Sequence, residues 1–223
     1  NVAKYLPDLL PRMLQHAPAL HTVVIDDGSA DDSAEVARAH GVEVIVHAIN
    51  RGKGEALKTG FSRTVEGGHP ASLTIDSDGQ HLPEEIPRFL EAWKAGAGIV
   101  VGSRMEANEN MPWLRKRTNE FMSWIVGALA AQRIPDSQSG YRLIDTRVLR
   151  SVHLETSRYD LESEILIKAG RLGYPVASVP ITTVYHDEVS SINPIVDTLR
   201  FFRLLWDSRR WVRHPGRAPE EET

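Results

Sequence analysis

The pattern of apolar and polar positions changes its period repeatedly along the chain. Short runs of apolar, mostly β-branched residues predict strands, which fall at residues 22–25, 42–46, 72–75, 98–102 and 176–181. Elsewhere apolar residues recur every three or four positions and predict helices, at about residues 2–14, 33–40, 50–61, 83–93, 113–131, 161–172 and 194–211. Strands that alternate with helices predict an α/β fold, with a mostly parallel sheet covered by helices on both faces.

One domain accounts for most of the chain, because 223 residues can bury a single core of ordinary size. We expect this domain to span residues 1–193 and an amphipathic helix to follow at 194–214. Residues 215–223 are rich in proline, glycine and glutamate, so they are expected to form a disordered tail.

The predicted C-terminal helix has two distinct faces. Ile195, Leu199, Phe202 and Trp206 share one face, and arginines line a neighbouring face. A helix of this kind is typical of a segment that lies on a membrane surface. The alternative is that the apolar face packs on the domain's own sheet.

Composition narrows the classes of function. A net charge of −4 gives no reason to expect a nucleic-acid partner. The chain has no cysteine, which excludes disulfides and thiolate metal ligands. No uninterrupted apolar run reaches the length of about 18 residues that a membrane-spanning helix needs.

Carboxylates follow the strand predicted at residues 22–25. Asp26 and Asp27 begin the turn "DDGS", which continues with Gly28 and Ser29. Either aspartate could accept hydrogen bonds from the base or ribose of a nucleotide. The same residues also suit an ordinary strand-to-helix turn, with the aspartate at position 31 or 32 as the helix cap.

A second acidic turn, "DSDGQ", follows the strand predicted at residues 72–75 and contains Asp76, Ser77 and Asp78. A calcium loop is excluded by spacing, because His81 and Pro87 stand where such a loop needs glycine and glutamate. Two carboxylates so close together need a positive charge nearby. They suit a hard divalent cation such as Mg²⁺, whose coordination shell is commonly completed by substrate phosphates.

The stretch "NRGKGEALKTGF" places Lys53 between two glycines at a predicted helix start, where backbone N–H groups favour an anion. It lacks the P-loop pattern, and a solvated lysine in a glycine-containing loop is the alternative. The positions of Asp26, Asp27 and Asp76 are also similar to those of the acidic residues in a phosphoacceptor receiver domain. Such domains need a lysine where this chain has Arg104, and they are much shorter.

Five segments occur in an order that carries a family resemblance: "VVIDDGSADDS", "NRGKGEALKTGF", "TIDSDGQHLPEEIPRFL", "VGSR" and "DSQSGYRLIDTRVL". Together they resemble family 2 glycosyltransferases of the GT-A (nucleotide-diphospho-sugar transferase) fold, in particular the dolichyl- or polyprenyl-phosphate sugar transferase branch. The resemblance implies inverting transfer of a sugar from a GDP- or UDP-sugar donor, with Mg²⁺ or Mn²⁺ on the diphosphate, to a polyprenyl phosphate. Two alternatives stay open: a family 2 transferase that acts on a sugar or protein hydroxyl, and a non-catalytic binding protein of the same fold.

The resemblance also implies roles for individual residues. The donor-binding set is Asp26, Asp27, Gly28, Ser29, Lys53, Asp76 and Ser77. The implied metal ligands are Asp78 and Gln80, and the implied catalytic set is Asp76, Asp78, Arg104 and Arg142, with the two arginines as cations on the acceptor side. Arg142 could instead be a structural ion-pair partner of Asp145 or Asp160. If the acceptor were a hydroxyl, Asp136, Asp160 and Glu162 would be candidate general bases.

The chain departs from the family pattern in three places. The family begins with a strand that this chain lacks, so the sheet is expected to be without its first strand. Near Tyr185 the sequence "YHDEVSSIN" differs from the family's pattern, which leaves the acceptor loop undefined. The segment "DSRRW" has aspartate where processive synthases have glutamine, so polymer synthesis is not expected. We expect a cytoplasmic protein, placed peripherally on the cytoplasmic face of the membrane.

Overall fold

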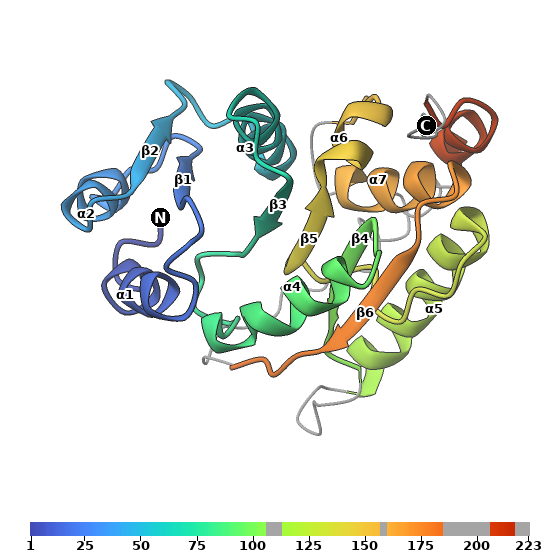
Figure 1. Cartoon of the computed structure of the whole chain (residues 1–223), viewed down its shortest axis with the longest axis horizontal. Coiled ribbons are helices and arrows are strands. Elements are labelled where there is room, and N and C mark those ends of the chain that lie inside the picture. Colours follow the sequence, from blue (N-terminus) through green and yellow to red (C-terminus); the bar gives the residue numbers. More distant parts are fainter. Residues whose placement is uncertain (106–112, 157–159, 185–205, 217–223) are drawn as a thin grey trace.

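The computed structural model describes residues 1–105, 113–156, 160–184 and 206–216 (Figure 1). Most of the helix predicted at 194–214, the tail at 215–223 and the acceptor loop after Tyr185 therefore lie outside the described residues. Residues 206–213 are helical, and Trp211 at its end is 1% exposed and packs into the largest hydrophobic cluster. None of the helices in the described ranges combines the length and apolar character that a bilayer-spanning segment needs.

Helices and strands alternate over most of the chain, as the sequence pattern predicts. The helices are α1 (Leu6–His16), α2 (Ser33–Ala39), α3 (Lys53–Glu66), the 3₁₀ turn Pro83–Glu85, α4 (Ile86–Lys94), α5 (Trp113–Ala130), α6 (Thr146–Ser151) and α7 (Asp160–Arg171). The strands are β1 (Val23–Asp26), β2 (Glu43–Val46), β3 (Ala71–Thr74), β4 (Ile99–Ser103), β5 (Arg142–Asp145) and β6 (Val176–Pro180).

The strands form two sheets among the described residues. β1 and β2 pair in parallel, and the second sheet has the order β3-β5-β4-β6. In that sheet β4 and β6 are parallel, whereas β5 runs antiparallel to both of its neighbours. The α/β fold class is confirmed. The four-stranded sheet is mixed because β5 is antiparallel to β3 and β4, and neither β5 nor the short helix α6 after it was predicted.

The core lies on both faces of the four-stranded sheet. Ile99 and Val101 of β4 pack with α5 and α7, while Val100 between them packs against α4 on the other face. Successive side chains of a strand point to opposite faces, so this strand is apolar at each of these positions. Complete burial of such a side chain contributes about 1.5–3 kcal/mol, and this packing makes the sheet a rigid support for the loops at its edge.

Candidate functional site

A partly buried charge cluster forms where α3 begins, β3 ends and α7 begins. The Nζ atom of Lys53 lies 2.9 Å from Oδ1 of Asp76 and 3.3 Å from Oε1 of Glu162. Burial on its own lowers the pKa of Lys53, but the charges of Asp76 and Glu162 outweigh it and leave that pKa above its ordinary value. The lysine therefore stays protonated, and it supplies a positive charge beside Asp76.

Gly140, in the loop before β5, is packed against this cluster. A Cβ atom built at position 140 would overlap the carboxylate of Asp76 and would lie 2.9 Å from Nζ of Lys53. Only glycine leaves room for the two charged groups in their observed positions. This glycine falls within the segment "DSQSGYR", and the sequence alone predicts no role for it.

The loop after β3 presents the implied metal ligands. Oδ1 of Asp78 accepts a hydrogen bond of 3.0 Å from the backbone N–H of Gln80, and both residues are half-buried. No group of three or more histidine, cysteine, aspartate or glutamate side chains that could hold a metal occurs within the described ranges. The donor chemistry nevertheless fits Mg²⁺ or Mn²⁺, because Asp76, Asp78 and Gln80 offer hard oxygen ligands in a number that leaves positions for phosphate oxygens.

Asp27 organises the loop that leads into α3. Its carboxylate accepts hydrogen bonds from the backbone N–H groups of Arg51 (2.9 Å) and Gly52 (2.6 Å), and it lies 2.6 Å from Nδ1 of His47. Burial acts to raise the pKa of Asp27, but these bonds outweigh it and hold the pKa below its ordinary value. Asp27 thus fixes the N-terminus of α3 and, through it, the position of Lys53.

The turn that contains Asp26, Gly28 and Ser29 is shaped by short-range contacts. Asp26 accepts a hydrogen bond of 2.9 Å from the backbone N–H of Ser29. Gly28 has a φ of +72°, and a Cβ there would lie 2.8 Å from the backbone N of Asn50. These contacts match the turn interpretation and bring residues 26–29 next to the loop before α3. They do not test the predicted nucleotide contact.

Arg104 forms a buried two-pronged ion pair with Asp136. Its Nε and Nη2 atoms lie 2.7 Å and 2.9 Å from the two carboxylate oxygens, and its backbone N–H donates to the same group. Asp136 is 0% exposed, so burial acts to raise its pKa, but the bonds from Arg104 outweigh this and lower it. A buried, paired carboxylate of this kind cannot reach an acceptor, which argues against Asp136 as a general base.

Arg142, on β5, is 2% exposed and donates to three main-chain carbonyl groups. The acceptors are Ser139 (2.7 Å), Ser137 (2.7 Å) and Glu162 (2.5 Å). Burial lowers the pKa of Arg142. These bonds tie the loop that carries Gly140 to the helix that carries Glu162, so they favour a positioning role for Arg142.

The structure thus brings Lys53, Asp76 and Glu162 together, with Asp78 and Gln80 two and four residues beyond Asp76. No role was predicted for His47, which supports Asp27, or for His81, which is 5% exposed and whose ring centroid lies 5.2 Å from that of Tyr141. Both histidines lie close in sequence to motifs described above. The sequence alone does not show that His47 contacts Asp27 or that His81 packs against Tyr141.

The chain is similar to proteins of one known family. Residues 1–154 match the protein family Glycosyl transferase family 2. The polyprenol monophosphomannose synthase of Mycolicibacterium smegmatis is 31% identical over 198 residues, which cover 82% of this chain and 73% of the relative. A UDP-N-acetylglucosamine–dolichyl-phosphate N-acetylglucosaminyltransferase of Methanococcus voltae is 30% identical over 208 residues, covering 82% and 83%.

A solved structure shows the same fold. Glucosyl-3-phosphoglycerate synthase from Mycobacterium tuberculosis, in complex with Mn²⁺, uridine diphosphate and glucosyl-3-phosphoglycerate, matches with a TM-score of 0.68 at 20% identity. The match covers 94% of this chain and 75% of that one. At this level of identity the likeness concerns the fold alone, and it confirms the predicted GT-A architecture.

Proposed function

Because this chain belongs to glycosyltransferase family 2, we propose that it transfers a sugar, with inversion, from a nucleotide-diphosphate donor to a polyprenyl phosphate. The acceptor is supported by two relatives, each aligned over 82% of this chain, whose names specify polyprenol or dolichyl phosphate chemistry. The observation that carries the proposal is the Lys53–Asp76–Glu162 cluster at the carboxyl end of β3. Ligands of open α/β sheets bind at this kind of edge.

Lys53 and its surroundings form the donor side of the proposed site. Its protonated amine, at the start of α3, attracts the diphosphate and stabilises the negative charge that grows on it as the bond to the sugar breaks. Asp26, Asp27, Gly28, Ser29 and Ser77 lie in the loops that would face the base and ribose of a UDP or GDP donor. Asp76 pairs with Lys53 and is the proposed contact for the donor's ribose or sugar.

Asp78 and Gln80 are the proposed ligands of a divalent cation, together with phosphate oxygens of the donor. Their hard oxygen donors suit Mg²⁺ or Mn²⁺, and a structural neighbour of this chain was solved with Mn²⁺ and uridine diphosphate. A cation held there would supply additional charge neutralisation to the departing diphosphate.

A phosphate acceptor requires no general base from the protein. Its second pKa, near ~6, leaves it anionic at neutral pH, so its oxygen can attack the anomeric carbon while the donor diphosphate leaves from the other side. Arg104 and Arg142 hold the loops behind the site through buried contacts. Arg117 at the start of α5, whose side chain is 76% exposed, is a more accessible cation for the acceptor.

We further propose that the protein meets its lipid acceptor at the cytoplasmic face of a membrane. Trp113, Phe121 and Trp124 are 76%, 53% and 69% exposed, and their spacing places them on one side of α5. Aromatic side chains favour the boundary between water and lipid. Trp206, on the helix at residues 206–213, is 70% exposed and belongs to the apolar face predicted for the C-terminal helix.

The acceptor assignment predicts a strong preference for a phosphorylated lipid. With a panel of UDP- and GDP-sugars and Mn²⁺, undecaprenyl phosphate should accept sugar at least about 10-fold faster than undecaprenol, because only the phosphate brings a preformed anionic nucleophile. Radiolabelled sugar transferred to the lipid is the measurement, and undecaprenol with added inorganic phosphate is the control. Equal rates for the two lipids would favour the second candidate, a transferase that acts on hydroxyl groups.

A further inference from the structure

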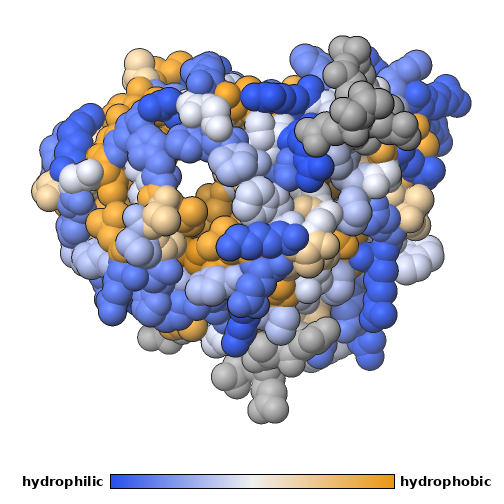
Figure 2. Space-filling model, viewed as in Figure 1, coloured by the Kyte–Doolittle hydropathy of each residue, from blue (hydrophilic) through white to orange (hydrophobic). Residues whose placement is uncertain are grey.

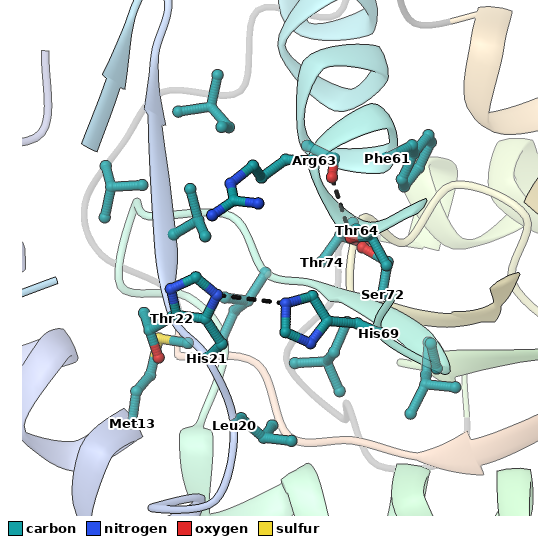
Figure 3. A pocket seen from close by; sticks show the side chains of 18 of the residues that line it. Met13, Leu20, His21, Thr22, Phe61, Arg63, Thr64, His69, Ser72 and Thr74 are labelled. Carbon is teal, nitrogen blue, oxygen red and sulfur yellow. Dashed lines mark hydrogen bonds between the residues drawn. The ribbon is translucent and has the colours of Figure 1, made fainter. Parts of the chain in front are cut away.

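Two histidine side chains meet at the amino ends of β1 and β3, which belong to different sheets. His21 and His69 each stand two residues before the strand that follows them. Nδ1 of His21 lies 3.4 Å from Nε2 of His69, and Figure 3 shows the two rings turned toward each other. The residues of the proposed donor site follow the carboxyl ends of the same strands, so the histidine pair is a separate feature of the fold.

The distance between the two ring nitrogens fits two ligands of one metal ion. Zn²⁺ binds imidazole nitrogens at about 2.0–2.1 Å in tetrahedral geometry, which places two such nitrogens about 3.3–3.4 Å apart. Two bonds of that length at a right angle, as in a square-planar site, would place them only about 2.9 Å apart. The observed 3.4 Å matches the tetrahedral value, and it is long for a direct hydrogen bond, since N–H donors usually lie about 2.7–3.2 Å from an acceptor oxygen. The ring planes are tilted by 39°, so the rings do not stack face to face.

A carboxylate lies behind His21, on the side away from His69. Nε2 of His21 is 3.2 Å from Oε2 of Glu43, and Arg63 holds that carboxylate with two hydrogen bonds of 2.7 Å and 3.0 Å. The bonds from Arg63 are the main cause that lowers the pKa of Glu43, so the carboxylate stays ionised. Its charge favours the proton of the imidazole on Nε2 and leaves the lone pair of Nδ1 directed toward His69. Histidines that bind metals commonly have their other ring nitrogen beside a carboxylate in this way.

The backbone around His69 is held on both sides. Its N–H donates a hydrogen bond of 3.1 Å to the carbonyl of Thr64, and its own carbonyl accepts one of 2.5 Å from Oγ1 of Thr146. The ring lies against Gly67, where a Cβ atom would be 2.8 Å from Nε2 of His69. The nitrogen that faces His21 is therefore placed by the fold before any ion binds.

The histidine pair is accessible to an ion from solvent. The side chain of His21 is 42% exposed. Both histidines line a cavity of about 510 Å³ between β1 and β3, and Figure 2 shows an opening at this place, with hydrophobic residues beside it. Two imidazoles leave two positions of a tetrahedral shell for water, so binding is weaker than at a zinc site with three or four protein ligands. Imidazole nitrogens suit Zn²⁺, whereas Mg²⁺ and Mn²⁺ prefer oxygen ligands such as those of Asp78 and Gln80.

We propose that His21 and His69 together bind one Zn²⁺ ion, with Glu43 behind His21 and water in the remaining positions. The ion links the amino ends of β1 and β3 and so holds the two sheets together at the end opposite the donor site. Its binding does not depend on the proposed sugar transfer, because none of these three residues belongs to the donor site.

Zinc titration of the chain without an affinity tag tests the assignment. Calorimetry at about pH 8, with Mg²⁺ in excess to occupy the oxygen ligands of the donor site, should show one Zn²⁺ per chain. His21→Gln and His69→Gln should each weaken binding at least about 100-fold, because each removes a ligand. Glu43→Gln should weaken it about 10-fold, as loss of a carboxylate behind a ligating histidine does. Zn²⁺ at about 100 times its Kd should raise the Tm of the wild type by at least about 3 °C.

His16→Gln is the matched control. Nε2 of His16 lies 3.5 Å from Oε1 of Glu84, and the His16 side chain is 34% exposed, so it resembles His21 in access to solvent and in having a carboxylate nearby. Its contact in the structure is with that carboxylate rather than with another histidine. The substitution should therefore leave both zinc binding and the Tm shift unchanged.

Co²⁺ reports on the geometry of the wild-type site without any substitution. Bound in place of Zn²⁺, it should give the visible absorption of a four-coordinate ion, and added Zn²⁺ should remove that absorption. The Tm of each variant without metal shows whether it is folded. The proposal would be overturned by a wild type that binds no Zn²⁺ under these conditions, or by His16→Gln weakening binding as much as His21→Gln. Binding of one ion per two chains would also overturn it, since the ion would then bridge two molecules.

Discussion

The Asp136→Ala variant is expected to lose about 3–5 kcal/mol of unfolding free energy, because it removes the carboxylate that forms the buried two-pronged pair with the Arg104 guanidinium. The side chain of Asp136 is 0% exposed and that of Arg104 is 9% exposed, so water cannot replace the lost carboxylate. Urea denaturation followed by circular dichroism measures the difference, provided the slope with denaturant is unchanged.

A matched control separates burial from charge pairing. Arg12 and Glu84 form a two-pronged pair of the same kind, at 2.9 Å and 2.7 Å, but their side chains are 33% and 39% exposed. Glu84→Ala should therefore cost no more than about 1 kcal/mol. A loss as small in Asp136→Ala would show that the buried pair contributes little to the fold.

The same pair predicts a dependence of stability on acid. Because the pKa of Asp136 is lower in the folded protein than its ordinary value of 3.8, the pair's contribution is fully present above that value. It is lost as the pH falls through the folded-state pKa. The difference in unfolding free energy between the wild type and Asp136→Ala should therefore become smaller as the pH falls below 3.8.

Gly140→Ala is expected to reduce sugar transfer about 100-fold while the protein stays folded. The new methyl group would overlap the Asp76 carboxylate and crowd Lys53, so both charged groups must move from the positions that the donor would meet. A displacement of about 1 Å in a catalytic arrangement can have an effect of this size. Initial rates at saturating donor, with Tm measured on the same samples, check it.

Gly60→Ala is the matched control for this substitution. At Gly60 a Cβ atom makes only an ordinary contact of 3.7 Å, so activity and stability should stay close to those of the wild type. Full activity of Gly140→Ala would mean that the Lys53–Asp76 pair does not need its observed position, and the site assignment would have to change.

The features that could be predicted from the sequence are those that depend on the local pattern of residues. Apolar runs located β1, β2, β3, β4 and β6, and the acidic turns after β1 and β3 pointed to one edge of the sheet. Lys53 was singled out because it sits between glycines at a helix start. Lys53 forms an ion pair with Asp76, 23 residues away, and so supplies a positive charge of the kind that the two carboxylates were expected to need.

Other features depend on contacts between distant segments. β5 is buried at all four positions, and so short a run has no period that distinguishes it from a buried turn or helix. Arg142 looked like a cation for the acceptor, yet its side chain bonds the carbonyls of Ser137, Ser139 and Glu162. The role of Gly140 is likewise visible only once Asp76 and Lys53 are placed around it.

The acidic turn after β3 and Lys53 are together proposed to bind the diphosphate of a nucleotide sugar with a divalent cation. The direct test is calorimetric titration of UDP-sugars and GDP-sugars into the wild type and the Asp78→Ala variant, each with Mn²⁺ and with EDTA. At least one donor should bind the wild type about 10-fold or more tightly with Mn²⁺ than with EDTA, and Asp78→Ala should lose that difference while its Tm is retained. Binding that is equal with Mn²⁺ and EDTA, or unchanged in Asp78→Ala, would show that this turn is not a metal-dependent donor site.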